Sequence, residues 1–305
     1  MGSYLRPLNT DKLAGNFLIK ALEVRDTNEL GDYIQKLVTA ENMLMNCESK
    51  DTLSSDDYRH IGYASDSDRK KLRKIIFDEL VFMPLLNNDD EIKLGNGGVI
   101  PEGGLKNENQ AYIITGLPAS GKSYFSTKIA HKMGAAIIDS DFAKRKFPEY
   151  SKPHGASIVH EESILVTFGL SDKYRDEPSL YEFMVFQKAN LVIPKIGHDK
   201  QSICDIRDAL KRKGYDVHLV YVSIDRVEST KRAFKRFEET GRYVPLSLIF
   251  DQYSNEPTVT FYRLMGDAAW TSVCKISTSE RNPSIVYMSH SKHFISDVIG
   301  GTSDV

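Results

Sequence analysis

Residues 116–123 read Gly-Leu-Pro-Ala-Ser-Gly-Lys-Ser and fill every fixed position of the pattern G-x-x-x-x-G-K-[ST]. The preceding residues 111–115 form a short apolar, β-rich run, and residues 124–132 carry apolar positions at helical spacing. A chance Gly- and Ser-rich turn is the alternative interpretation. The motif stands between a strand and a helix, however, which is the context that a phosphate-binding loop requires. We therefore expect this chain to bind a nucleoside triphosphate.

Each fixed residue of this motif has a physical role. Two glycines let the backbone turn its N–H groups toward a phosphate, the lysine supplies a mobile positive charge for the β and γ phosphates, and the Ser123 hydroxyl can ligate Mg²⁺. ATP or GTP together with Mg²⁺ are the expected cofactors. The predicted nucleotide site consists of Gly116, Pro118, Ala119, Ser120, Gly121, Lys122, Ser123 and Tyr124.

The composition is that of an ordinary globular protein. The chain has 305 residues, of which 41% are hydrophobic and 27% charged. Lys and Arg total 40 against 42 Asp and Glu, so no overall basic field favours nucleic acid as a partner. No stretch approaches the ~20 apolar residues that cross a bilayer, and the N-terminus lacks the apolar core of a signal peptide. Scattered cysteines (Cys47, Cys204 and Cys274) indicate reduced thiols, and we expect a cytoplasmic protein without a membrane partner.

The organisation of the chain changes near residue 105. Residues 10–46 and 68–82 carry helical apolar patterns, and residues 87–109 are polar and rich in Gly and Asn, which is typical of a loop or linker. We therefore predict a mostly helical N-terminal region with its linker over residues 1–105. The α/β domain that contains the phosphate loop follows over residues 106–305.

From residue 110 onward, predicted strands alternate with predicted helices. This alternation indicates an α/β fold, with a parallel sheet of the P-loop NTPase type flanked by helices and an N-terminal helical annex. Ligands of such sheets bind at the carboxyl ends of the strands. The expected strands are 111–115, 136–139, 190–194, 217–224 and 272–277, and the expected helices are 121–133, 155–169, 199–213, 226–239 and 245–266, the last in one or two pieces.

Two carboxylates, Asp139 and Asp141, follow the second predicted strand. If that strand lies near the phosphate loop, they face the place where an acceptor hydroxyl would wait, and a kinase needs a carboxylate to orient or deprotonate that hydroxyl. The alternative for Asp141 is a helix N-cap, because Asp commonly caps helices at such turns. We predict a catalytic role for Asp141.

Arginines cluster in the helix and loop after the fourth predicted strand. Gly241 and Pro245 end a helix and begin a loop that can carry Arg242 over the phosphates as a lid. A guanidinium there would neutralise charge on the phosphoryl group in flight. A basic helix face is usually only solvated, but the nearby phosphate loop favours a catalytic role for Arg236 and Arg242 over one for Arg232.

The chain between about residues 105 and 280 resembles the zeta toxin kinases, which transfer a nucleotide γ-phosphate to a hydroxyl of UDP-N-acetylglucosamine. The resemblance implies that Asp141 is the catalytic base, that Glu162 belongs to the acceptor site and that an antitoxin-like protein inhibits an enzyme toxic to its target cell. The matching segments are the phosphate loop, Ile-Asp-Ser-Asp-Phe-Ala-Lys over residues 138–144, His-Glu-Glu-Ser-Ile-Leu over 160–165, Asn-Leu-Val-Ile over 190–193, Lys-Gly-Tyr over 213–215, the arginines Arg236 and Arg242, and Asn-Glu-Pro-Thr over 255–258.

The third predicted strand departs from that family. Where the toxins usually end this strand in Glu followed by a Gly-Thr type turn, this chain has Pro194, Lys195 and Ile196, followed by a turn that contains His198. A proline side chain neither donates nor accepts a hydrogen bond. The sequence could therefore lie nearer to the effector kinases that phosphorylate a ribose hydroxyl of NAD and are delivered into a host cell. Lys195 and His198 are candidate contacts to the acceptor's phosphates.

Two other classes of function stay open at this point. A polynucleotide kinase shares the predicted architecture but would need a basic groove with aromatic platforms for a nucleic-acid strand. A nucleotide-binding NTPase module without an acceptor would carry an Asp at the end of an apolar strand, and Asp139 fits that pattern. The acceptor therefore separates the three classes.

Overall fold

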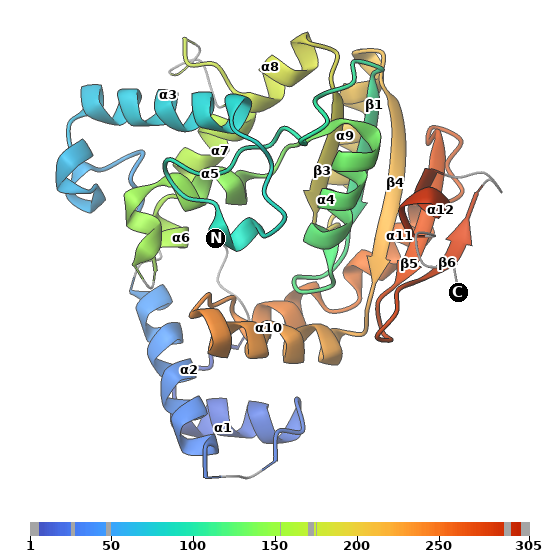
Figure 1. Cartoon of the computed structure of the whole chain (residues 1–305). Coiled ribbons are helices and arrows are strands. Elements are labelled where there is room, and N and C mark those ends of the chain that lie inside the picture. The colour runs from blue at the N-terminus through green and yellow to red at the C-terminus, as the bar shows by residue number, and fades with distance from the viewer. Residues whose placement is uncertain are drawn as a thin grey trace.

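A computed structural model describes residues 6–25, 28–46, 50–152, 154–169, 174, 176–289 and 294–299. One mixed sheet stands in the middle of the molecule with helices on both faces, and the N-terminal helices lie along one side (Figure 1). The predicted α/β fold is confirmed.

The sheet has six strands in the order β2-β3-β1-β4-β5-β6. The first five strands are parallel, as predicted, and β6 pairs antiparallel with β5 at the edge. No strand was predicted over β6, because an edge strand with half-exposed residues carries little apolar signal. The bounds are β1 (Gln110–Thr115), β2 (Ala135–Ile137), β3 (Asn190–Lys195), β4 (Asp216–Ser223), β5 (Ser272–Ser277) and β6 (Ser284–Met288).

The central strand β1 explains why the phosphate loop lies at the middle of the sheet. Its residues 111–115 are all buried, with β3 on one side and β4 on the other. Continuous burial is expected of a parallel strand that helices cover on both faces. The loop that follows β1 therefore opens between two neighbouring strand ends, where parallel sheets bind ligands.

The helices of the α/β part match the prediction only in part. The predicted helix 155–169 is divided into α6 and α7, the predicted helix 245–266 consists of a π-helical segment η6 followed by α11, and α5, α8 and α12 were not predicted. The bounds are α4 (Lys122–Met133), α5 (Ser140–Lys146), η4 (Pro148–Ser151), α6 (Gly155–Ile158), α7 (His160–Phe168), α8 (Leu180–Phe186), α9 (Lys200–Arg212), α10 (Arg226–Thr240), η6 (Leu248–Tyr253), α11 (Glu256–Leu264) and α12 (Phe294–Ile299).

The N-terminal region packs in two separate places. Helix α3 (Asp66–Phe82) buries Leu72, Ile76 and Leu80 in the main core beside the sheet helices. Helices α1 (Asp11–Lys20) and α2 (Leu30–Met45) form a second apolar cluster with α10 and η6. Short 3-10 turns η1 (Asp56–Tyr58), η2 (Ile61–Tyr63) and η3 (Asp89–Glu91) complete the region. The division of the chain at residue 105 stays a prediction.

Neither described cysteine is in a disulfide. Cys204 is partly buried, Cys274 is buried in β5, and Cys47 lies outside the described residues. Within the described ranges, no helix is long and apolar enough to cross a membrane.

Candidate active site

The phosphate loop is fixed by its glycines. A Cβ on Gly116 would stand 2.5 Å from the Val222 carbonyl oxygen of β4, and Gly121 has a φ of 93° at the N-cap of α4. No other residue type fits both positions without strain. The Lys122 Nζ donates hydrogen bonds to the carbonyl oxygens of Gly116 at 2.7 Å and Leu117 at 2.6 Å. The lysine therefore links the end of the loop to its first two residues.

Side chains from two other elements hold the loop from outside. The Ser229 hydroxyl of α10 donates to the Pro118 carbonyl at 2.6 Å, and the Thr278 hydroxyl after β5 donates to the Ser120 carbonyl at 2.9 Å. The loop that the sequence predicted is therefore tied to α10 and to the residues after β5.

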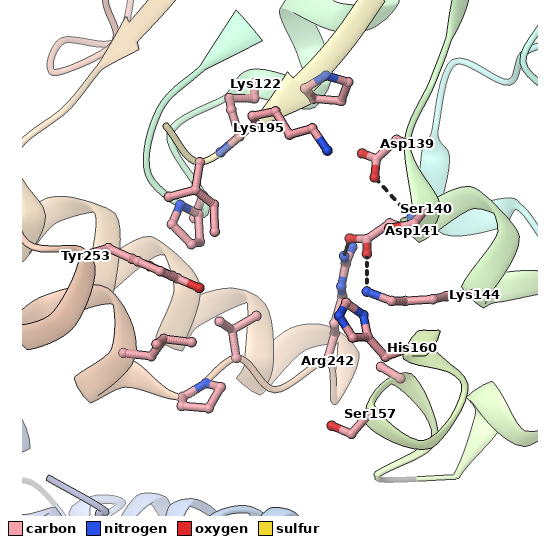
Figure 2. A pocket seen from close by; sticks show the side chains of 18 of the residues that line it. Lys122, Asp139, Ser140, Asp141, Lys144, Ser157, His160, Lys195, Arg242 and Tyr253 are labelled. Carbon is pink, nitrogen blue, oxygen red and sulfur yellow. Dashed lines mark hydrogen bonds and ion pairs between the residues drawn. The ribbon is translucent and has the colours of Figure 1, made fainter. Parts of the chain in front are cut away.

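A cleft of about 960 Å³ lies in front of this loop, at the carboxyl ends of the strands. Its walls come from the phosphate loop, the starts of α5 and α7, the end of β3 and the segment from α10 to η6 (Figure 2). Of the predicted nucleotide-site residues, five line it: Pro118, Ala119, Gly121, Lys122 and Ser123. Gly116 and Ser120 are buried within the turn, and the Tyr124 ring is half-exposed on the outer face of α4.

The two carboxylates after β2 have different roles in the structure. Asp139 is the N-cap of α5, because its carboxylate accepts the Asp141 backbone N–H at 3.0 Å. The capping alternative therefore applies to Asp139 and not to Asp141. The Asp141 carboxylate points into the cleft and forms ion pairs with Lys144 at 2.9 Å and Arg242 at 2.6 Å (Figure 2).

The surroundings push the pKa values of these carboxyls in opposite directions. Burial and the neighbouring Asp141 charge raise the pKa of Asp139. Burial alone would raise the pKa of Asp141 as well, but the charges of Lys144 and Arg242 outweigh it and hold that pKa well below its usual value. Titratable pairs separated in this way are typical of sites that handle protons.

Two lysines of the cleft, Lys122 and Lys195, are poorly solvated. Burial lowers the pKa of Lys122 to about 7, although the Asp139 charge opposes the shift. Burial also lowers the pKa of Lys195, whose Nζ lies 4.3 Å from the centre of the Phe168 ring. Within the described residues this Nζ has no carboxylate within ion-pair distance. A bound anion would raise the pKa of both lysines, because a nearby negative charge favours the protonated form.

Two of the three clustered arginines reach the cleft. Arg242 does so through its ion pair with Asp141, and Arg236 lines the wall with a buried Nε that lacks a hydrogen-bond partner among the described residues. Burial and the Arg242 charge lower the pKa of Arg236. Arg232 instead binds Glu228 and the Thr278 carbonyl, so its guanidinium is satisfied elsewhere.

Glu162 does not lie in the cleft, which contradicts its predicted place in the acceptor site. Its carboxylate is fully buried and accepts hydrogen bonds from Arg69 at 2.6 Å, Arg73 at 2.9 Å and the Thr52 hydroxyl at 2.6 Å. The helical turn of α7 points residue 162 toward α3, whereas the preceding residues His160 and Glu161 face the cleft. Glu162 therefore joins α7 to α3 and is not free to bind a ligand.

The structure adds cleft residues that the sequence interpretation missed. Burial, followed by the Lys144 charge, lowers the pKa of His160 to about 4, and its Nδ1 has no partner among the described residues. Tyr253 of η6 points into the cleft, and its ring lies 5.0 Å from that of His198. Tyr253 belongs to no motif, and the segment over residues 160–165 that begins with His160 does not by itself show which of its side chains face the cleft. Lys195 and His198 line the cleft, and their contact with an acceptor stays a prediction.

This fold and cleft define a nucleotide-binding protein with the fold of a P-loop kinase. The family model described as zeta toxin matches residues 106–264 of the 305, and the chain belongs to the zeta toxin family. A comparison with curated proteins finds no match.

Solved structures with a similar fold share little sequence with this chain. A chain of the PezAT chromosomal toxin-antitoxin system of Streptococcus pneumoniae is 18% identical, with a TM-score of 0.44 over 64% of this chain and 78% of that one. A chain of the native AvrRxo1-ORF1:-ORF2 complex is 16% identical, with a TM-score of 0.47 over 77% and 73%. A gluconokinase from Sinorhizobium meliloti 1021 is 17% identical, with a TM-score of 0.33 over 56% and 84%. These likenesses concern the fold alone.

Proposed function

We propose that this protein transfers the γ-phosphate of ATP or GTP to a ribose or sugar hydroxyl of a small nucleotide, such as NAD or UDP-N-acetylglucosamine. The observation that carries the proposal is the placement of Lys122 and Asp141 on opposite walls of one cleft. A cation for the transferred phosphate and a carboxylate for the acceptor hydroxyl are the two groups that phosphoryl transfer needs most. The cleft volume of about 960 Å³ is at the upper end of the range for small-molecule sites, which suits a donor and an acceptor bound together.

In the proposed reaction, the acceptor oxygen attacks the γ-phosphorus while the bond to the bridging oxygen breaks and the nucleoside diphosphate leaves. Asp141, ionised at neutral pH, accepts a hydrogen bond from the acceptor hydroxyl and then takes its proton as the new bond forms. The incoming phosphates compete for Arg242, and loss of that ion pair raises the basicity of Asp141. Arg236 and Arg242 stabilise the charge on the transferring group, as bidentate guanidinium groups do.

The residues present also suit Mg²⁺. The Ser123 hydroxyl lies exposed at the first turn of α4 on the cleft wall, and the described residues contain no group of three or more His, Cys, Asp and Glu that could hold a metal. Mg²⁺ usually takes one or two protein ligands, substrate phosphates and water rather than a full protein cage. When bound, the ion would neutralise phosphate charge, and Ser123 would be its ligand.

The far wall of the cleft is our proposed acceptor site. Lys195 forms no ion pair within the described residues and lies over the Phe168 ring at 4.3 Å, and the rings of Tyr253 and His198, 5.0 Å apart, line the same cleft. A cation next to aromatic rings suits a phosphate attached to a base or nucleoside. Pro194 and Ile196 offer no side-chain hydrogen bonds to an N-acetylated sugar, so we propose that NAD or a similar dinucleotide is accepted at least as well as UDP-N-acetylglucosamine.

The biological setting is proposed on family membership. We propose a cytoplasmic enzyme, or an effector delivered into a host cell, that is toxic to its target and is inhibited by an antitoxin-like protein. Such a partner would be supported if the enzyme co-purifies with a protein encoded by a neighbouring reading frame and that protein abolishes its activity.

A transfer assay tests the function. The protein is incubated with γ-³²P-labelled ATP or GTP and, separately, NAD, UDP-N-acetylglucosamine or an oligonucleotide, with the Lys122→Ala variant as the control. We expect one phosphate to be added to a small nucleotide by the wild type and none by the variant. Label on the oligonucleotide alone would show a polynucleotide kinase, and release of inorganic phosphate alone would show an NTPase.

A further inference from the structure

Arg242 lies on a segment with little regular structure of its own. We call residues 241–247, between α10 and η6, the arginine loop. Gly241 ends α10 with a φ of 71°, and Arg242, Tyr243, Val244 and Pro245 then line the cleft. The position of the Arg242 guanidinium therefore depends on what holds this loop from behind.

Helix α2 supplies one such contact through Glu41. This side chain is fully buried, and its carboxylate accepts hydrogen bonds from the Tyr243 hydroxyl and from the Leu8 backbone N–H at 3.3 Å. The Tyr243 ring also packs edge to face on Phe237 of α10, with ring centres 4.9 Å apart. The buried Glu41 carboxylate accepts a hydrogen bond from the Tyr243 hydroxyl and so fixes the position of the residue next to Arg242.

The segment that follows the loop is held by α1 and by the residues that precede it. The Arg6 guanidinium donates to both carboxylate oxygens of Asp251, at 3.0 and 2.9 Å. The ring of Phe17 meets Phe250 edge to face at 5.4 Å. Leu246, from the loop itself, is fully buried in the apolar cluster of α1, α2 and α10. Helices α1 and α2, with the segment before α1, therefore contact the arginine loop at Tyr243 and Leu246 and the residues just beyond its end.

We propose that α1 and α2 brace the arginine loop so that Arg242 faces Asp141, and that Glu41 is a positioning residue for phosphoryl transfer. The inference rests on the proposed function and deepens it, because it gives the N-terminal helices a part in the reaction. Glu41 is absent from the cleft wall and acts through Tyr243. Small displacements of a positioned group cost large factors in rate, since the geometry of the reacting atoms is lost.

The test uses Glu41→Ala in the full chain. We expect kcat to fall by about 10- to 100-fold, while the Kd for nucleotide changes less than about twofold, because the phosphate loop is untouched. The matched control is Glu23→Ala, which removes an exposed ion pair at 3.4 Å to Lys231 across the same helix interface, away from the loop. The control should keep the kcat of the wild type.

A second variant separates positioning from general damage to the fold. Tyr243→Phe removes the same hydrogen bond from the other side and keeps the ring, so its loss in kcat should resemble that of Glu41→Ala. The double variant should lose no more than Glu41→Ala alone, because residues that act through one contact are not additive. An unchanged kcat in folded Glu41→Ala, or fully additive losses, would overturn the inference. Where Glu41→Ala does not fold, Tyr243→Phe carries the same expectation.

Hydrogen–deuterium exchange gives a readout that does not depend on the acceptor. Residues 241–250 should exchange faster in Glu41→Ala than in Glu23→Ala, while α4 exchanges at the same rate in both. Equal exchange in the loop would refute the brace even if the enzyme transfers phosphate. Failure of the proposed function is distinguishable, because the wild type would then label no acceptor while the exchange difference persists.

Discussion

The substitution Asp141→Asn is the sharpest test of the proposed chemistry. It keeps the shape of the side chain but removes the charge that Lys144 contacts at 2.9 Å and Arg242 at 2.6 Å. The amide cannot take a proton from the acceptor hydroxyl. We expect kcat to fall by ~10²- to 10⁴-fold, the range for loss of a general base, which corresponds to about 3 to 5 kcal/mol in the activation barrier.

Nucleotide affinity, unlike kcat, should not fall in Asp141→Asn. The variant releases Lys144 and Arg242 from a carboxylate and removes a negative charge near the phosphates, so the Kd for ATP should stay equal or become slightly lower. The assay is steady-state label transfer for kcat, together with calorimetric titration of a non-hydrolysable ATP analogue for Kd.

Asp139→Asn is the matched control for this prediction. Asn also caps helices well, so α5 should keep its start and the stability of the protein should change little. If Asp141→Asn keeps kcat within about threefold of the wild type while Asp139→Asn loses it, Asp139 is the base. If Asp141→Asn instead abolishes nucleotide binding, Asp141 serves the metal or the phosphates, and the assignment of the acceptor side is refuted.

Three further predictions follow from the same geometry. Arg242→Lys should lower kcat at least tenfold with little change in nucleotide Kd, because lysine keeps the charge but loses the planar guanidinium with its paired donors. Equal activity of Arg242→Lys and the control Arg232→Lys would contradict a role of Arg242 in stabilising the transferring group. With its pKa lowered to about 7, Lys122 is mostly neutral at pH 8 and must gain a proton when phosphates bind. The nucleotide Kd should therefore rise by up to about tenfold per pH unit above 7. Calorimetry at pH 8 in buffers of different ionisation enthalpy should detect the proton uptake, and a result without uptake would refute this prediction. Glu162→Gln should lower the free energy of unfolding by about 1.5 to 3 kcal/mol in denaturant titrations, because it weakens the charge-assisted hydrogen bonds from buried Arg69 and Arg73. Each arginine keeps a second carboxylate partner, Glu149 or Glu177. The exposed neighbour in Glu161→Gln should change the free energy of unfolding by less than about 0.5 kcal/mol.

The sequence interpretation succeeded where the signal is local. The phosphate loop, the five parallel strands and the helices α4, α9 and α10 each follow from the order of residues within one short segment. It failed at Glu162, because the direction of one side chain on a helix depends on which neighbour covers that face. It also missed Tyr253, which belongs to no motif, and His160, because the segment over residues 160–165 does not show which of its side chains face the cleft.

The sequence by itself determined that a phosphate loop follows a buried parallel strand, because glycine conformations and apolar runs are properties of the local chain. Only the tertiary structure decided which side chains meet Asp141 in the cleft and what holds them there. Glu41 and Tyr243 are 202 residues apart, and Asp141 and Arg242 are 101 residues apart. Contacts over such separations are set by the packing of whole elements, since each element buries its apolar face against partners distant in sequence.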